Sequence, residues 1–298
     1  MAIGDGRPTE DLQAVQMSTN LEGSIAVASF TLRACSAIHN GRFRKIFGKK
    51  QDVAMVAARQ DAFRKGEGQL VWKPFVVEFT GVAGVGKTAV ANKVCELLER
   101  KTNPSRVVLK HDRLSIMKAL LSLRAFLEAI MGLRVLVNAG PRSLRRLMLQ
   151  AKKWVRAHYK LWGCRYVPAI HLVDHGFFQT LRGMSGGNKR DIGWVGEQLF
   201  SHVARPDLVV VLLADEETIS LRRRSREKVT PIVDPRGPKN AVSRMPEFAR
   251  FIESTASRRG TQVLMLRNGP DDELGRVAEA ICGRIMGMVN GTSGNCER

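Results

Sequence analysis

Eight consecutive residues of this sequence have the types and the spacing that phosphate binding requires. Gly81–Thr88 reads G-x-x-x-x-G-K-T. Glycines allow a tight turn that brings successive backbone N–H groups onto phosphate oxygens, where a Cβ atom would interfere. Lys87 can reach the β- and γ-phosphates of a nucleotide, and the Thr88 hydroxyl can ligate Mg²⁺. The alternative is a glycine-rich turn that binds nothing, and the flanking sequence disfavours it.

The residues on either side of this motif predict the strand and the helix that would position it. Phe75–Phe79 is an apolar run of the kind found in buried strands. After the motif, Val90, Val94 and Leu98 recur at helical spacing. The amino end of such a helix carries a partial positive charge that favours bound phosphate. We therefore expect nucleotide phosphates to contact Gly81, Gly84, Val85, Gly86, Lys87, Thr88 and Ala89.

A second candidate group follows the apolar run Ala169–Val173, which is followed directly by Asp174. In open parallel sheets, ligands bind at the carboxyl ends of the strands. A carboxylate at that end can hold Mg²⁺ or accept the proton of a substrate hydroxyl. Asp174 is therefore predicted to be catalytic and, with Thr88, to bind the metal. His175 and Gln179 follow it and are predicted to contact the substrate.

A further pair of polar residues, Asp112 and Arg113, follows the predicted strand Arg106–Lys110. Their position at a carboxyl end favours substrate binding. Asp112 also precedes an apolar helical pattern, where it would serve as an N-cap. Both interpretations stay open, so either Asp174 or Asp112 could be the catalytic base.

An arginine-rich segment follows the apolar strand predicted at Leu208–Leu213. The acidic residues from Asp215 start a helix that carries several arginines. Residues 222–245 are basic and contain Pro and Gly, a composition typical of a lid. Guanidinium groups on such a lid can neutralise a transferring phosphate. Arg222 and Arg226 are therefore predicted to be catalytic.

The sequence is strongly basic, with a formal net charge of +20, which favours anionic partners. No acid occurs between Glu128 and Asp174, and the pattern over residues 142–160 predicts a basic helix. The apolar stripe expected on this helix consists of Leu144, Leu147, Met148, Ala151, Trp154, Val155 and Leu161. An anionic membrane surface is one partner for this helix and for residues 25–50. Solvated accessory helices are the alternative. Nucleic acid is disfavoured because no basic strand carries interleaved aromatic residues for base stacking. A homodimer stays open.

Cysteine spacing and hydropathy bear on the compartment. The five cysteines are scattered, without metal-ligand spacing. No apolar run approaches the roughly 20 residues that span a bilayer. Acids near the amino terminus do not fit a secretory signal. We expect a cytoplasmic protein, with peripheral association at the inner membrane face as the alternative.

Alternating strands and helices predict a three-layer α/β/α fold with a five-stranded parallel sheet. We expect an N-terminal extension over residues 1–70, partly disordered and partly helical. Residues 71–290 form the predicted main domain, with a basic helical insert at 113–165 and the lid at 222–245. A disordered tail is predicted over residues 291–298.

The order of these features resembles the thymidylate-kinase-like branch of the P-loop kinases, from about Phe75 to Val289. The resemblance lies in Gly81–Thr88, the strand ending at Asp174, and the acid-started helix leading to Arg222–Arg226. The sequence departs from the family where Asp174-His175 replaces Asp-Arg and where Phe178-Gln179 comes early. The resemblance implies ATP and Mg²⁺ as cofactors and leaves the acceptor open.

Three functions follow from these patterns. The first is an ATP-dependent kinase that acts on a nucleotide, nucleoside, sugar or lipid-linked sugar, that is, on an anionic or hydroxyl-bearing small acceptor. The second is a P-loop ATPase that acts with nucleic acid or a membrane-bound partner. A GTPase is disfavoured because Asn188–Asp191, which fits N-K-x-D, does not follow an apolar strand. The third is a binding protein with a structural loop, which an intact Lys87 and Thr88 oppose.

Overall fold

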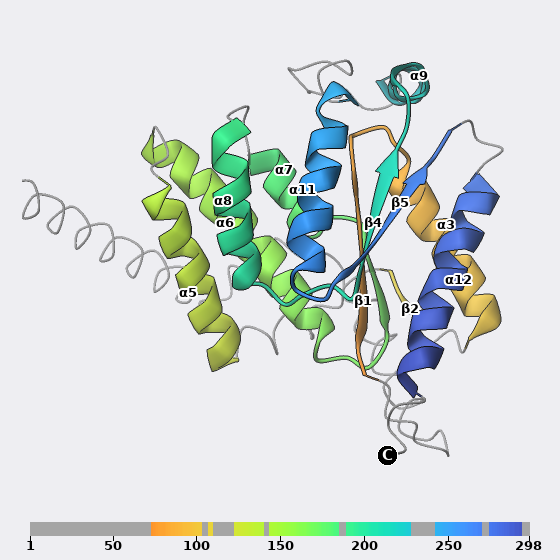
Figure 1. The fold of residues 1–298 in the computed structure, drawn as a ribbon, viewed down its shortest axis with the longest axis horizontal. Helices are drawn as coiled ribbons and strands as arrows, with labels where there is room; N and C mark the ends of the chain where they lie inside the picture. Colours follow the sequence, from red (N-terminus) through yellow and green to blue (C-terminus); the bar gives the residue numbers. More distant parts are fainter. Residues whose placement is uncertain are drawn as a thin grey trace, which may run out of the picture.

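Five parallel strands form one central sheet in the order β2-β3-β1-β4-β5 (Figure 1). The strands are β1 (Phe75–Gly81), β2 (Val107–Val108), β3 (Ile170–Val173), β4 (Leu208–Leu213) and β5 (Gln262–Arg267). The computed structural model describes residues 73–102, 107–109, 122–139, 143–184, 189–227, 242–269 and 274–293. The predicted five-stranded parallel sheet is confirmed.

Strand β1 lies at the centre of the sheet, and every one of its residues is buried. Glu78 is paired in register with Val173 of β3 and with Val209 of β4. Strands covered on both faces are apolar on both faces, which explains the near-continuous runs of Val, Leu and Ile. The carboxyl end of β1 therefore opens between those of β3 and β4, where ligands bind in such sheets.

Helices cover both faces of the sheet (Figure 1). Helices α3 (Lys87–Lys101) and α12 (Leu274–Ser293) pack together on one face. The other face carries α6 (Leu144–Cys164), α7 (Phe177–Met184) and α11 (Met245–Ser257). Helices α5 (Leu123–Asn138) and α8 (Lys189–Ser201) pack outside these, and α9 (Glu216–Glu227) follows β4.

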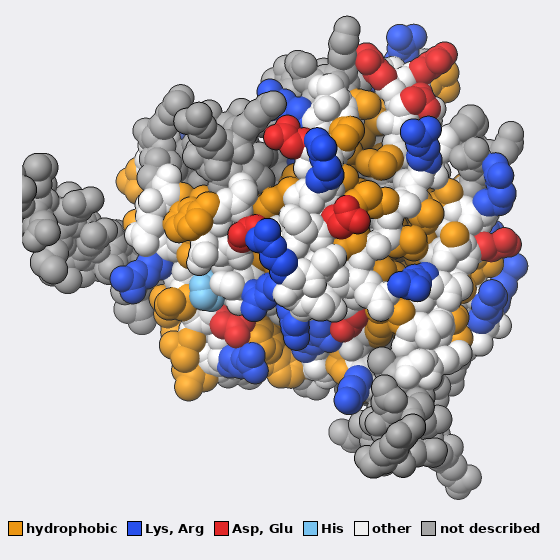
Figure 2. Space-filling view, in the orientation of Figure 1, with side chains coloured by type: hydrophobic (Ala, Val, Ile, Leu, Met, Phe, Trp, Pro, Cys, Tyr) orange, Lys and Arg blue, Asp and Glu red, His pale blue; other side chains and the backbone are white. Residues whose placement is uncertain are grey.

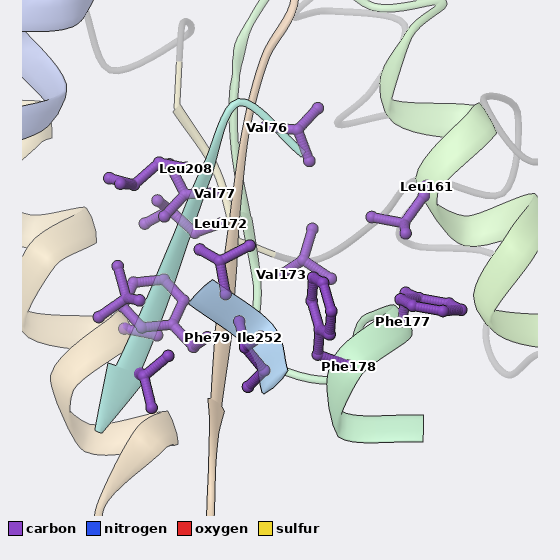
Figure 3. Close-up of a cluster of buried hydrophobic side chains, with 14 of the residues drawn as sticks. Val76, Val77, Phe79, Leu161, Leu172, Val173, Phe177, Phe178, Leu208 and Ile252 are labelled. Carbon is purple, nitrogen blue, oxygen red and sulfur yellow. The ribbon is translucent and has the colours of Figure 1, made fainter. Parts of the chain in front are cut away.

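The core lies on both sides of β1, because successive side chains of a strand point to opposite faces (Figure 3). Val77 and Phe79 point to the side of α3, and Val76 points to the other side. On that second side, Phe177 and Phe178 of α7 are fully buried and pack against Phe200. Glu78, which follows Val76 by two residues, shares this second side with α7.

Several sequence predictions lie outside the described residues: the extension over residues 1–70, most of the lid, and residues 294–298. The tail differs from expectation at its start, since α12 continues to Ser293, beyond residue 290. The apolar stripe expected on the basic helix also differs. Ala151, Trp154 and Leu161 are buried on α6, whereas Leu144 and Met148 are exposed. Lys189–Asp191 of the N-K-x-D match form the start of α8, and the preceding described element is the helix α7, not a strand.

Candidate active site

The glycines of the loop between β1 and α3 adopt backbone conformations that other residues rarely take. Gly84 and Gly86 have φ angles of 93° and 91°. A Cβ atom on Gly81 would lie 2.6 Å from the carbonyl oxygen of Leu212. One on Gly86 would lie 2.6 Å from the side-chain nitrogen of Asn268. The glycines are therefore required by both backbone conformation and space.

Lys87 lies at the start of α3, and its side chain folds back over the loop. Its buried ammonium group donates hydrogen bonds of 2.9 Å to the carbonyl oxygens of Gly81 and of Val82. Thr88 and Ala89, the next two residues, are exposed. The positive charge is thus held at the mouth of the loop, and the threonine hydroxyl faces solvent at the amino end of the helix.

Side chains of α9 and of the residue after β5 donate hydrogen bonds to carbonyl oxygens of the loop. Arg223 donates from Nε to the carbonyl of Ala83 at 3.1 Å, and its side chain is buried. Asn268 donates from Nδ2 to the carbonyl of Val85 at 2.6 Å. Arg222 donates to the same carbonyl at 3.3 Å.

These contacts fix the orientation of two peptide groups. In a trans peptide, the N–H points away from the C=O of the same group. Because the carbonyls of Ala83 and Val85 face α9 and β5, the N–H groups of Gly84 and Gly86 point the opposite way. The N–H of Val85, which lies between them, donates to the carbonyl of Val82 at 3.3 Å. Loop N–H groups turned away from the neighbouring elements can form part of an anion-binding concavity.

Asp174 lies directly after β3 and beside a lysine of α6. Lys160 places its Nζ 3.7 Å from Oδ1 of Asp174 and donates to the carbonyl of His175 at 3.3 Å. Burial lowers the pKa of Lys160, against the opposing effect of the Asp174 carboxylate. Burial also lowers the pKa of His175, and the positive charges of Lys87 and Lys160 act in the same direction. The end of β3 and the lysine of the loop therefore share one electrostatic environment.

A fully buried glutamate lies beneath this site. Oε1 of Glu78 accepts hydrogen bonds from the backbone N–H groups of Phe178, at 2.6 Å, and Gln179, at 3.3 Å. Its Oε2 has no hydrogen-bond partner within the described structure. Burial raises the pKa of Glu78 to about 7, against the lowering effects of these backbone bonds and of Lys160. The carboxyl group thus joins β1 to the first turn of α7.

Gln179 extends this connection to the loop. Its side-chain oxygen accepts from the backbone N–H of Gly81 at 3.3 Å and from the hydroxyl of Thr80 at 3.4 Å. The predicted substrate residue therefore contacts the first residue of the phosphate loop. Gly176 is required here too, because a Cβ atom on it would lie 2.4 Å from the carboxyl carbon of Glu78.

The structure gathers most of the predicted residues at the carboxyl ends of β1 and β3. Asp112 and Arg113 lie outside the described residues, as does the side chain of Arg226. Three residues that the sequence analysis missed belong to this region: Glu78, Lys160 and Asn268. Glu78 could have been singled out in the sequence, because it is a lone acid within an apolar strand. Lys160 could not, because it is one of many bases on its helix, and Asn268 could not, because it is an ordinary polar residue after the last strand.

The residues present fit a Mg²⁺ ion that is bound chiefly through phosphate. Within the described ranges, no group of three or more His, Cys, Asp or Glu side chains is placed to hold a metal. Thr88 is exposed at the loop, and Asp174 is partly exposed at the next strand. Mg²⁺ keeps several waters and takes one or two protein ligands in such sites, which is what these two oxygen donors can supply.

Comparisons with known proteins find similarity in solved structures only. No protein-family model matches the sequence, and no curated protein matches it. The chain is similar to thymidylate kinase from Ehrlichia chaffeensis, with 12% identity, a TM-score of 0.38, and coverage of 72% of this chain and 99% of that one. It is also similar to deoxyadenosine kinase from M. mycoides, with 11% identity, a TM-score of 0.42, and coverage of 72% and 100%.

These similarities, at 12% and 11% identity, concern the fold alone. The chemistry follows from the loop and its neighbours, described above.

Proposed function

We propose that this protein is an ATP-dependent phosphotransferase, a kinase that moves the γ-phosphate of ATP to a small acceptor. One observation carries the proposal. The ammonium group of Lys87 donates to the carbonyls of Gly81 and Val82 in a loop whose peptides are held in an anion-binding orientation, and the Asp174 carboxylate directly follows the neighbouring strand β3. A glycine turn without function has no physical need for this lysine, which is costly to bury.

Each group has a distinct task in this proposal. The loop N–H groups and Lys87 bind the donor phosphates, and Asp174 takes the proton of the acceptor hydroxyl. The bond from the acceptor oxygen to the γ-phosphorus forms as the bond to the β-phosphate oxygen breaks. Thr88 and Asp174 would hold Mg²⁺, which supplies charge neutralisation when bound. Positioning and electrostatics of this kind are the main requirements of phosphoryl transfer.

The acceptor is proposed only by class: an anionic or hydroxyl-bearing small molecule. Gln179, which is predicted to contact the substrate, accepts hydrogen bonds from Gly81 and Thr80. An ATPase that acts with nucleic acid or a membrane-bound partner is the second candidate, favoured by the net charge of +20.

The test is consumption of Mg-ATP by the full chain, with and without nucleosides, nucleoside monophosphates, sugars and lipid-linked sugars. Stimulation by one class, lost in Lys87→Ala, is expected. Lys93→Ala is the matched control, because Lys93 lies on the same helix and pairs with Glu96 at 2.9 Å. Turnover that Lys87→Ala leaves intact would overturn the donor site. Turnover stimulated by nucleic acid and by no small acceptor would favour the ATPase.

A further inference from the structure

Helix α6 exposes a face on which basic and apolar side chains alternate. Arg145, Met148, Leu149 and Lys152 are all exposed, and their spacing of three, four and seven residues places them on one side of the helix. Arg156 continues this side by one more turn. We call these five residues the outer face of α6. Leu149 is 54% exposed and Met148 is 47% exposed.

Other residues of the same helix form its buried side and make its hydrogen bonds to α5. Ala151, Trp154, Ala157, His158 and Leu161 are buried. Trp154 donates from its indole N–H to the carbonyl of Ala129, and His158 contacts the carbonyl of Ala125 at 2.7 Å. Met148 and Leu149 therefore take no part in the packing of α6 on α5 and on the core, and both stay exposed to solvent. Within the described residues these two are among eight exposed large apolar side chains, and they lie side by side between basic residues of the same helix face.

The charge of this region has one sign. Helices α5 and α6 together carry eight Lys or Arg residues, two on α5 and six on α6, and one acid, Glu128. That acid is engaged within the helix pair, where it accepts from Arg124 and from Trp162, each at 3.2 Å. Elsewhere, over α9, α11 and α12, acidic and basic side chains are interspersed (Figure 2). The outer face of α6 lacks this balance.

We propose that the outer face of α6 docks on an anionic phospholipid surface. Lysine and arginine side chains would contact lipid headgroups, while Met148 and Leu149 would enter the boundary with the acyl chains. This combination of buried apolar area and cationic charge is how interfacial helices bind membranes. The proposal goes beyond phosphate transfer and does not depend on it.

Charge complementarity favours an anionic phospholipid surface over the other partners that could cover this face. A second copy of the chain that met this face through its own outer face of α6 would bring the same cations against it. Residues 23–51 of the chain itself contain no acid and several bases, so they also do not complement it. A nucleic acid would suit the charge. However, the apolar residues of the face are aliphatic, and single strands are bound by aromatic side chains on which bases stack.

The test is sedimentation of the full chain with two kinds of vesicle, one of pure phosphatidylcholine and one that also contains phosphatidylglycerol. Binding to the anionic vesicles only is expected. Arg145→Glu/Lys152→Glu should weaken it by roughly tenfold or more. Met148→Ser/Leu149→Ser should weaken it without any change in net charge. Both variants alter exposed positions, and unchanged circular dichroism and melting temperature would establish that they fold.

The matched control is Arg250→Glu/Arg284→Glu, which changes the net charge equally on exposed positions of α11 and α12. It should keep vesicle binding. Equal loss in the control would mean attraction by the overall charge, and the proposal would fail. The proposal would also fail if neither α6 variant changed vesicle binding, if the wild type bound only nucleic acid, or if the α6 variants acted by separating a dimer seen in light scattering.

Discussion

At the scale of single residues, Glu78 is where burial and charge conflict. Its carboxyl group is completely buried, and burial raises its pKa from 4.5 to about 7. The folded state therefore holds this proton more tightly than the unfolded chain does. The resulting contribution to stability is present below about pH 4.5 and is lost as the pH rises to about 7.

Glu78→Gln tests this. The amide cannot ionise, and its oxygen can still accept the two backbone bonds of α7. As the pH rises from about 5 to about 8, wild type should lose stability through the ionisation of Glu78, whereas the variant should not. The difference in unfolding free energy, variant minus wild type, should therefore increase by on the order of 1–3 kcal/mol over this range. Urea unfolding at both pH values measures it. Glu279→Gln, on an exposed position of α12, is the control and should show no such change. Parallel pH profiles for Glu78→Gln and wild type would contradict the raised pKa.

Asp174 differs from Glu78 because it is partly exposed at the mouth of the site. Asp174→Asn removes the proton acceptor and keeps the shape, so transfer should fall by about 10²–10⁴-fold. Lys87 and the loop should still bind Mg-ATP in the variant. Calorimetry and a transfer assay measure the two effects separately. Asp215→Asn is the matched control, since Asp215 lies two residues after β4 and caps α9 by accepting from the N–H of Thr218. If Asp174→Asn transferred phosphate at the wild-type rate, Asp174 would not be the catalytic base, and Asp112 would become the candidate.

At the scale of elements, the contact between α5 and α6 depends on a glycine. A Cβ atom on Gly132 would lie 2.2 Å from the ring of Trp154, which is buried and has no room to move aside. The absence of a side chain on Gly132 therefore lets α5 and α6 approach closely at this residue.

Gly132→Ala should destabilise the protein by about 1–3 kcal/mol through overpacking. Gly283→Ala is the matched change on α12, where nothing lies within 4 Å of the added atom. It should stabilise by up to about 1 kcal/mol, because alanine is the better helix former. Thermal melting of both variants measures the difference. Equal effects would mean that α5 and α6 are not held at the distance described.

The elements that the sequence predicted best are those whose signals are local. The strand before Gly81, the helix after Lys87 and the strand Leu208–Leu213 each follow from a run of neighbouring residue types. Asn268 and Lys160 could not be assigned in this way, because their partners lie 183 and 14 residues away in the chain, at Val85 and Asp174. Their roles exist only once the parallel sheet brings strand ends together.

The exposed face of α6 was missed for a related reason. Met148 precedes Ala151 by three residues, so the sequence places it with the apolar stripe. The side of α6 that is buried depends on where α5 and α7 pack. Periodicity identifies the helix, whereas tertiary contacts decide which of its apolar residues face water.

At the scale of the whole molecule, the phosphate loop is supported from distant parts of the chain. Its carbonyls accept from Lys87, Arg222, Arg223 and Asn268. These contacts join β1, α9 and the end of β5 across the sheet, and all of them lie between residues 73 and 269. The proposed donor site is thus assembled by contacts within the predicted main domain.

A chain that starts at Val71 should therefore bind Mg-ATP with an affinity within about threefold of the full chain, a difference under 1 kcal/mol. Isothermal calorimetry on both chains measures this, and Lys87→Ala in the shorter chain is the blank. The vesicle assay on the same two chains separates the basic regions, because the outer face of α6 is kept when residues 25–50 are removed. If the shorter chain folds, judged by circular dichroism, yet no longer binds Mg-ATP, the first 70 residues complete the donor site.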